Sequence, residues 1–358
     1  MKILTKKVIN EVLINLKNNY SDNYDLQRFG SKKNTTLIKK IKYYTGLKYC
    51  KAVWVLSTYK VALNKTYALL ENNESKKLFV KLLAYKILGY KKVKLPLSTP
   101  DYWENIFKLN DFKTNDYLEA LWGSNKIKLY RYDLDNQKLD LPIKIYYTAK
   151  GLNTHINSKQ YRYKTGDIEI RPELGDIVLD CGACYGDTAL FFANEIGENG
   201  FVYSFDFINS NIDVFEKNVD LNTSLKKRIS LISKPVGKVS NINLRYIDNG
   251  PGSRICNDSR SSNEVLTATT IAIDDFTNEI QKKIDFIKMD IEGAELDALK
   301  GAVKTIRKFK PKLAISIYHS LDDFVNIPIW IDSLNLGYKL YLGHYSIHNE
   351  ETVIYAKV

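Results

Sequence analysis

Two kinds of site are possible in the segment VLDCGACYGDTALFF, near the middle of the chain. Cys181 and Cys184 stand three positions apart, a spacing found in metal sites and in redox-active thiol pairs. Asp180 and Gly182 point to another use, because glycines between a strand and a helix allow the backbone to approach a bound nucleotide. The elements around the segment decide which interpretation is better supported.

A metal or redox role for the cysteines has little support. A closed zinc site needs four ligands, and neither Cys50, Cys256 nor the four histidines supply a second closely spaced pair. We therefore expect Cys181 to point into a sheet and Cys184 to lie on a loop, both as small packing residues. Four cysteines in 358 residues do not form a disulfide framework of the secreted kind.

The chain after residue 170 alternates short apolar runs with helical stretches. The runs are DIVLDC, FVYSFDF, ISLISKP, DFIKMD and KLAISIY, followed by YKLYLGH and ETVIYAKV close together at the end. This alternation predicts an α/β fold with a mostly parallel sheet covered on both faces, and the last strand can pair antiparallel. Ligands of such sheets bind at the carboxyl ends of the strands, so the acidic residues that end these runs should converge on one cleft.

The first strand, loop and helix of this region suit a nucleotide. The strand ends at Asp180, the loop runs from Gly182 to Gly186, and Asp206 ends the next strand, where its carboxylate could accept hydrogen bonds from both hydroxyls of a ribose. The spacing G-x-x-x-G differs from the dinucleotide pattern G-x-G-x-x-G. A carboxylate at position 180 would repel phosphates but suits an ammonium and a sulfonium. The sequence therefore predicts S-adenosyl-L-methionine as the cofactor.

Six ordered segments resemble the FkbM-type S-adenosylmethionine-dependent methyltransferases. They are VLDCGACYGDTALFF, VYSFDF, NVDLN, TTIAIDDF, IDFIKMDIEGAELDALKGA and GYKLYLGHYSIHNEETVIYA, and the resemblance covers about residues 165 to 358. It implies a class I methyltransferase (Rossmann-like) fold with a seven-stranded sheet whose last strand is antiparallel. It also implies methyl transfer to a hydroxyl of a sugar or natural product. Two positions depart from the family pattern: Asp206-Phe207 replaces Glu-Pro, and Cys184 stands where Asn is more frequent.

The expected cofactor residues lie in three places: the first loop with its helical turn, the end of the second strand, and the loop after the third strand. They are Asp180, Gly182, Ala183, Gly186, Asp187 and Thr188 for the methionine end, Asp206 for the ribose, and Phe207, Pro235 and Val236 for the adenine.

Methyl transfer from a sulfonium is an in-line displacement, so the protein mainly aligns donor and acceptor. A hydroxyl acceptor must also lose its proton, which requires a base or a cation that stabilises the alkoxide. The candidate catalytic residues are Asp290 and Glu292 after the fourth strand, Lys288 on the same side, and His319 after the fifth strand. The structural alternatives are that Glu292 caps a helix beginning at Gly293 and that Lys288 only neutralises Asp290.

Other residues near the expected cleft are weaker candidates. Tyr318 faces the same rim as His319, while His344 and His348 lie in the loop before the final strand. No spacing predicts a metal site, although several carboxylates near one cleft leave a divalent ion as an open alternative.

Charge divides the chain. Residues 1–100 contain 21 basic residues against 5 acidic ones, whereas residues 171–358 contain 21 against 26. We expect three parts: a basic helical region over 1–115, a small β-rich connecting layer over 116–170, and the methyltransferase domain over 171–358. The basic region could attract phosphate-bearing partners or an anionic surface weakly, or it could be a lysine-rich solvated face.

The function expected from these features is O-methylation of a saccharide, a nucleotide-sugar or a glycan. The alternatives are an RNA ribose methyltransferase that uses the basic region, and a non-catalytic binding module. We expect a cytoplasmic protein without a transmembrane segment, because no stretch approaches roughly 18 apolar residues. We also expect no stable nucleic-acid partner, and a homo-oligomer is possible.

Overall fold

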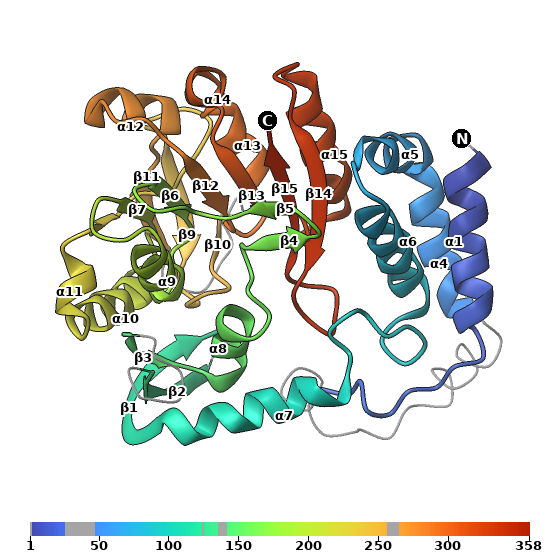
Figure 1. Ribbon diagram of the computed structural model, residues 1–358, viewed down its shortest axis with the longest axis horizontal. Coiled ribbons are helices and arrows are strands. Elements are labelled where there is room, and N and C mark those ends of the chain that lie inside the picture. Colours follow the sequence, from blue (N-terminus) through green and yellow to red (C-terminus); the bar gives the residue numbers. More distant parts are fainter. Residues whose placement is uncertain (1, 26–46, 124, 135–141, 256–264) are drawn as a thin grey trace.

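A computed structural model of the chain describes residues 2–25, 47–123, 125–134, 142–255 and 265–358. Its centre is a seven-stranded sheet in the order β14-β15-β13-β12-β6-β7-β8 (Figure 1). The strands are β6 (Ile177–Cys181), β7 (Phe201–Phe205), β8 (Ile229–Ile232), β12 (Phe286–Met289), β13 (Lys312–Ser316), β14 (Lys339–His344) and β15 (Thr352–Lys357). β15 runs antiparallel to β13 and β14, and the remaining pairs are parallel. The predicted class I methyltransferase fold is confirmed.

Both faces of the sheet are covered. Alternate residues pack on one side against α12 (Ile273–Ile280), α13 (Glu295–Lys300), α14 (Val303–Phe309) and α15 (Leu321–Ser333). The other side packs against α8 (Ala149–Ile156), α9 (Asp187–Glu195), α10 (Asn209–Asp220) and α11 (Thr223–Lys226). Strands buried on both faces contain few polar residues, and for this reason the sheet could be recognised as apolar runs.

The N-terminal helices extend one of these layers beyond the edge of the sheet. They are α1 (Lys2–Asn15), α4 (Leu47–Thr58), α5 (Lys60–Leu69) and α6 (Asn73–Leu88). The side chain of Asn72 caps α6 by accepting from the Ser75 N–H, and the helix ends at Gly89, which has a positive φ of 80°. Asparagine at the start and glycine at the end are both common at helix termini. α6 packs against α1 and β14, and α5 packs along α15.

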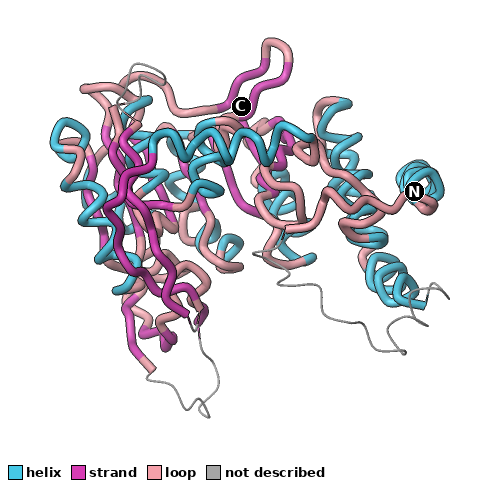
Figure 2. The backbone as a smooth tube through the Cα atoms, turned by 90° about the horizontal axis from the view of Figure 1, so that it is seen from below, coloured by secondary structure: helices cyan, strands magenta, loops and turns pink. Residues whose placement is uncertain are grey.

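A third group of elements lies beneath the carboxyl ends of the parallel strands, an edge that we call the carboxyl edge (Figure 1). It contains α7 (Pro100–Lys108), the 3-10 helix η1 (Leu109–Phe112), and the sheet of β1 (Lys113–Trp122), β2 (Asn125–Asp133) and β3 (Lys144–Tyr147). The short pair β4 (Tyr163–Thr165) and β5 (Ile168–Ile170) follows α8. Figure 2 shows the sheet of β1, β2 and β3 and the N-terminal helices at opposite ends of the molecule.

The connecting segment differs from the β-rich layer expected there, because it also contains the helix α8. Thr148 caps this helix by accepting from the Gly151 N–H, and Leu152 and His155 form its buried side. Gly151 and several residues around it have a low helix propensity, so the sequence did not indicate this helix. A further sheet was also not predicted, in which β9 (Asn243–Ile247) pairs with β10 (Arg254–Ile255) and β11 (Leu266–Thr269). The division into three parts stays a prediction.

Within the described ranges, no helix combines the length and the apolar character that crossing a bilayer requires. Cys256 and the basic residues between 26 and 46 lie outside these ranges.

Candidate active site at the carboxyl edge

The loop after β6 is held tightly against its neighbours. Gly182, Cys184 and Gly186 have positive φ values of 83°, 47° and 80°. A Cβ on Gly182 would lie 1.9 Å from the carbonyl oxygen of Asp290, so only glycine fits there. The N–H groups of Gly182 and Ala183 both donate to the carbonyl of Phe205, at 2.9 and 3.0 Å. The loop therefore touches the end of β7 on one side and the residue after β12 on the other.

The two cysteines behave as packing residues in this loop. Cys181 is buried in the core beneath α12–α15, and Cys184 is half-buried. Burial raises the pKa of both thiols, and neighbouring carboxylates add to the increase. The protonated thiol is a poor nucleophile and a poor metal ligand, so the arrangement gives no support to a redox or metal role.

Asp180 and Lys288 form an ion pair directly beneath the loop. The Lys288 Nζ lies 3.0 Å from the Asp180 Oδ1, and the two side chains are 2% and 0% exposed. Thr188 Oγ1 donates to the other carboxylate oxygen at 2.7 Å. Lys288 also donates to the carbonyl oxygens of Gly182 at 2.6 Å and Cys181 at 3.3 Å. The ion-pair partner of Lys288 is thus Asp180, not Asp290, and the pair holds the loop from below.

Asp206 lies immediately after β7, beside the loop. Its carboxylate accepts from the N–H groups of Cys184 and Ile208, at 2.8 and 2.9 Å. Burial raises the pKa of Asp206 to about 6, although these backbone donors oppose the increase. The amide of Asn211 contacts the same carboxylate at 3.5 Å, and the buried Asn211 Oδ1 has no hydrogen-bond partner among the described residues. A poorly solvated carboxylate beside an unused amide oxygen suits a ligand with several hydroxyl or amino donors, such as adenosine.

The remaining cofactor candidates lie around Asp206. The ring of Phe207 packs edge-on against Tyr246, with the centroids 4.9 Å apart. The carbonyl of Pro235 accepts from the N–H of Ile271 at 3.0 Å, and Val236 packs in the same apolar core as Phe205. Asn211 was not among the sequence candidates, although its place one turn into the helix after Asp206 could have indicated it.

Asp187 points away from the loop, toward the elements beneath it. Its carboxylate lies 2.6 Å from His155 Nε2 and accepts from the Tyr147 hydroxyl at 3.0 Å. Burial opposes ionisation of Asp187, but its hydrogen bond with His155 and the charge of that ring outweigh burial and lower the pKa. His155 in turn stacks on Phe191 at 4.8 Å. The sequence contains no spacing that connects His155 to Asp187, 32 residues later.

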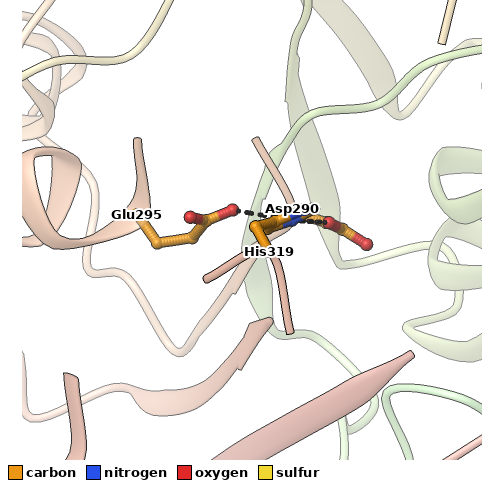
Figure 3. A group of neighbouring side chains, drawn as sticks. All are labelled: Asp290, Glu295 and His319. Atoms are coloured by element: carbon orange, nitrogen blue, oxygen red, sulfur yellow. Dashed lines mark hydrogen bonds and ion pairs between the residues drawn. The ribbon is translucent and has the colours of Figure 1, made fainter. Parts of the chain in front are cut away.

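A second cluster forms where β12 and β13 end (Figure 3). His319 Nε2 lies 2.9 Å from Asp290 Oδ1 and 3.2 Å from Glu295 Oε1. The donor atoms of these three residues lie within 4.8 Å of one another, a spacing that can hold either a divalent ion or a shared proton. The cluster touches the cofactor loop directly, because the Asp290 N–H donates to the carbonyl of Cys181 at 3.0 Å.

Two tyrosines and a further carboxylate complete this cluster, and we call the whole group the acid–base cluster: Asp290, Glu295, His319, Tyr161, Tyr318 and Glu351. Tyr161 donates to Asp290 at 2.9 Å and Tyr318 donates to it at 3.1 Å. Glu351 accepts from Gln160 at 2.6 Å. Burial and then the charge of Asp290 raise the pKa of Glu351 to about 8. Except for Tyr318, the sequence did not indicate these partners, because they come from α13 and from the segments that follow α8 and β14.

Glu292 does not cap a helix, so that structural alternative was wrong. It has a positive φ of 57°, and α13 begins only at Glu295. Glu295 Oε1 instead accepts the N–H of Ile291 at 2.8 Å and closes the turn. The Glu292 carboxylate lies 3.7 Å from His319 Nδ1, at the partly exposed rim of the cluster.

The two other histidines near the edge are buried in separate places. His344 Nδ1 contacts Thr352 at 2.8 Å, and His348 Nδ1 contacts the Tyr85 hydroxyl at 3.0 Å. Burial lowers the pKa of His344 to about 3, so this ring is neutral.

The protonation of His319 should be visible in the stability of the protein. Burial alone would lower the pKa of His319, but hydrogen bonds with Asp290 and Glu295 outweigh it and raise the pKa to about 11. Because this pKa is higher in the folded state, its stabilising contribution is complete below about pH 6.5 and is lost as the pH rises toward 11. The free energy of unfolding should therefore fall between pH 7 and 9, by at most about 1.4 kcal/mol per pH unit.

The measurement is urea denaturation of the protein and of His319→Gln at pH 7, 8 and 9. The difference in unfolding free energy between the two should shrink as the pH rises. Parallel pH dependences would show that His319 is not held as an imidazolium.

Comparison with known proteins agrees with this fold. The model of the methyltransferase FkbM domain matches residues 180–340. The crystal structure of methyltransferase FkbM from Methylobacillus flagellatus KT superposes with a TM-score of 0.52 at 19% identity, over 84% of this chain and 59% of that one. The chain thus spans about three fifths of the length of that protein, and the similarity shows a shared fold.

Two further structures are less similar. Aeropyrum pernix fibrillarin with natively bound S-adenosyl-L-methionine has a TM-score of 0.38 at 13% identity, over 68% of this chain and 100% of that one. A putative rRNA-methylase from Clostridium thermocellum has a TM-score of 0.36 at 13% identity, over 52% and 87%. A search of the curated proteins finds no match.

Proposed function

We propose that the protein uses S-adenosyl-L-methionine to methylate a hydroxyl group of a saccharide, and the match of the methyltransferase FkbM domain model to residues 180–340 supports this. The cofactor would lie against the loop 182–186 and Asp206. When bound, it supplies a methyl group activated by a sulfonium. The acceptor would approach from the side of Asp290.

The observation that carries this proposal is the direct contact between the cofactor loop and the acid–base cluster. The carbonyl of Asp290 approaches Gly182 so closely that a side chain is excluded there. A carboxylate next to the methyl donor can accept the proton of a hydroxyl as the new carbon–oxygen bond forms. The hydroxyl becomes strongly acidic at that moment, so even a carboxylate of low basicity is sufficient.

Four members of the cluster have distinct proposed parts. Burial opposes ionisation of Asp290, but its contacts with His319 outweigh burial and lower its pKa, so this carboxylate is charged and can receive the proton. Tyr161 and Tyr318 orient it through their hydroxyls. With a pKa near 11, His319 is a cation near neutral pH, which makes it a stabiliser of the developing alkoxide and not the base. Lys288 and Asp180 would position the loop.

The charge of the cluster supports a neutral acceptor. Three carboxylates, those of Asp290, Glu292 and Glu295, lie within 3.7 Å of a single imidazole. A phosphodiester would be repelled by this surface, whereas sugar hydroxyls can donate to it. Methylation of RNA ribose is the second candidate, and the observation in its favour is the excess of basic residues in the first 100 positions.

The cofactor assignment can be tested by replacing Asp206 with alanine. We expect the affinity for S-adenosyl-L-methionine to fall about 10- to 100-fold, since hydrogen bonds to a charged group contribute roughly 1.5–3 kcal/mol. Calorimetric titration measures this change. Asp213→Ala is the matched control, because Asp213 is an exposed carboxylate on α10, the helix that follows Asp206. An unchanged affinity in Asp206→Ala would show that this carboxylate does not hold the ribose.

The acceptor class can be tested with methyl-labelled cofactor and fractionated cell extracts. Label is expected in carbohydrate that glycosidases release. Label that ribonuclease releases, together with RNA binding that falls steeply with salt, would support the RNA candidate and refute the saccharide.

A further inference from the structure

A surface pocket lies beneath the carboxyl edge, outside the sites described above. Its volume is about 330 Å³, and its lining includes Tyr24, Asp25, Trp103, Ile106, Thr148 and Lys150. These residues belong to three separate parts of the chain: the segment after α1, helix α7 and the N-terminus of α8. Figure 1 shows α7 and α8 on the side of the molecule toward which the parallel strands point.

The pocket combines aromatic surface with hydrogen-bonding groups. Trp103 is 37% exposed, and the buried ring of Tyr102 supports it edge-on at 5.1 Å. The ammonium of Lys150 pairs with the buried carboxylate of Asp25. An aromatic face packs well against the C–H face of a pyranose, while an ammonium that the buried carboxylate holds in place and the hydroxyl of Thr148 can bind the ring hydroxyls.

The pocket and the acid–base cluster are linked through the chain around α8. The charges of Asp25 at the pocket and of Glu350 and Glu351 near the cluster all act on Tyr102, whose pKa is raised first by burial and then by these charges. Helix α8 begins at the pocket, and the chain after it supplies Gln160 and Tyr161 to the cluster. An eight-residue helix is about 12 Å long. The pocket is therefore suited to a sugar unit next to the one that is methylated, and not to the reacting unit.

A second, smaller pocket also borders α7. It is lined by Asp22, Lys94, Thr99, Trp103 and Ile347, among others, so Trp103 borders both. Lys94 and Asp22 form an ion pair there. Trp103 borders both pockets, which we together call the trough, and its indole with the charged groups around it favours a saccharide over a purely apolar ligand.

We propose that this trough binds a pyranose unit of an oligosaccharide acceptor, with the ring stacked on Trp103 and its hydroxyls bound by Lys150 and Thr148. The proposal rests on the proposed function, because it places part of the saccharide acceptor of the same active site. A nucleobase could also stack on Trp103, and the test below includes it.

The test is saturation-transfer NMR of the full-length protein with maltotriose, cellotriose and chitotriose, with AMP as the nucleotide probe. At least one trisaccharide is expected to bind, and Trp103→Ala should weaken that binding at least tenfold. Trp103→Phe should retain part of it, because a smaller aromatic face remains. Trp122→Ala is the matched control, since Trp122 is 50% exposed at the end of β1 and lines neither pocket.

Three results would overturn the trough assignment: no trisaccharide binds, binding is equally strong in Trp103→Ala, or AMP binds at Trp103 while the trisaccharides do not. Circular dichroism of each variant shows that it is folded. Calorimetry with S-adenosyl-L-methionine on the same samples separates the two hypotheses. If the unmodified protein does not bind S-adenosyl-L-methionine, the proposed function is refuted. If it binds the cofactor but no trisaccharide, only the trough assignment is refuted.

Discussion

Lys288→Met is expected to lower the free energy of unfolding by about 3–5 kcal/mol, because it leaves a buried charge without its partner. The carboxylate of Asp180 is completely buried, and its Oδ1 is paired with the Lys288 ammonium. The same ammonium satisfies the carbonyl oxygen of Gly182, which would also lose its donor. Methionine has similar length and no charge, so the loss comes from the interactions rather than from a cavity. Urea denaturation measures it.

Two variants make this result specific. Lys226→Met removes an exposed lysine that pairs with Asp220, and it should cost less than about 1 kcal/mol. Adding Asp180→Asn to Lys288→Met removes the unpaired charge, and the double variant should regain part of the lost stability. If Lys288→Met were as stable as Lys226→Met, the ion pair would not be what holds the loop beneath the cofactor site.

The sheet could be predicted from the sequence because its strands are buried on both faces. All four residues of β12 (FIKM) are buried, and so are four of the five residues of β6 (IVLDC). Each strand of this kind appears in the sequence as a mostly apolar run of 4–5 residues, and helical stretches separate most of the runs. The acidic residues at the carboxyl ends of β6, β7 and β12 were expected to converge, and Asp180, Asp206 and Asp290 do lie around one loop.

The partners of those acids could not be predicted, because they depend on tertiary contacts between distant segments. Asp180 and Asp187 look alike in the sequence, yet Lys288 neutralises the first and His155 binds the second. Tyr161 reaches Asp290 across 129 positions. A sequence of this kind identifies which carboxylates reach the carboxyl edge, whereas the structure shows which of them are already occupied. Asp206 and Asp290 are the two that the geometry favours for ligand and chemistry.

Asp290→Asn is expected to reduce turnover about 10²- to 10⁴-fold, the usual contribution of a positioned acid or base. Asparagine keeps the shape and can still accept from Tyr161 and Tyr318, but it cannot take the proton of the acceptor hydroxyl. The affinity for S-adenosyl-L-methionine should change by less than about threefold, since the loop contacts Asp290 through its backbone N–H and carbonyl, which the substitution leaves in place. Single-turnover transfer of labelled methyl to the carbohydrate fraction measures the first effect, and calorimetry measures the second.

The control for Asp290→Asn is Asp297→Asn, an exposed carboxylate on α13 that pairs with Lys300. It should leave both quantities unchanged. A combined loss of cofactor affinity and turnover in Asp290→Asn would mean that this residue shapes the loop and is not the base. Full turnover would exclude Asp290 and point to Glu351, a second carboxylate of the cluster, whose pKa burial still raises when the charge of Asp290 is removed. The rate of the variant would then rise with pH through this raised pKa. The pH profile of the variant therefore distinguishes the two carboxylates as proton acceptors.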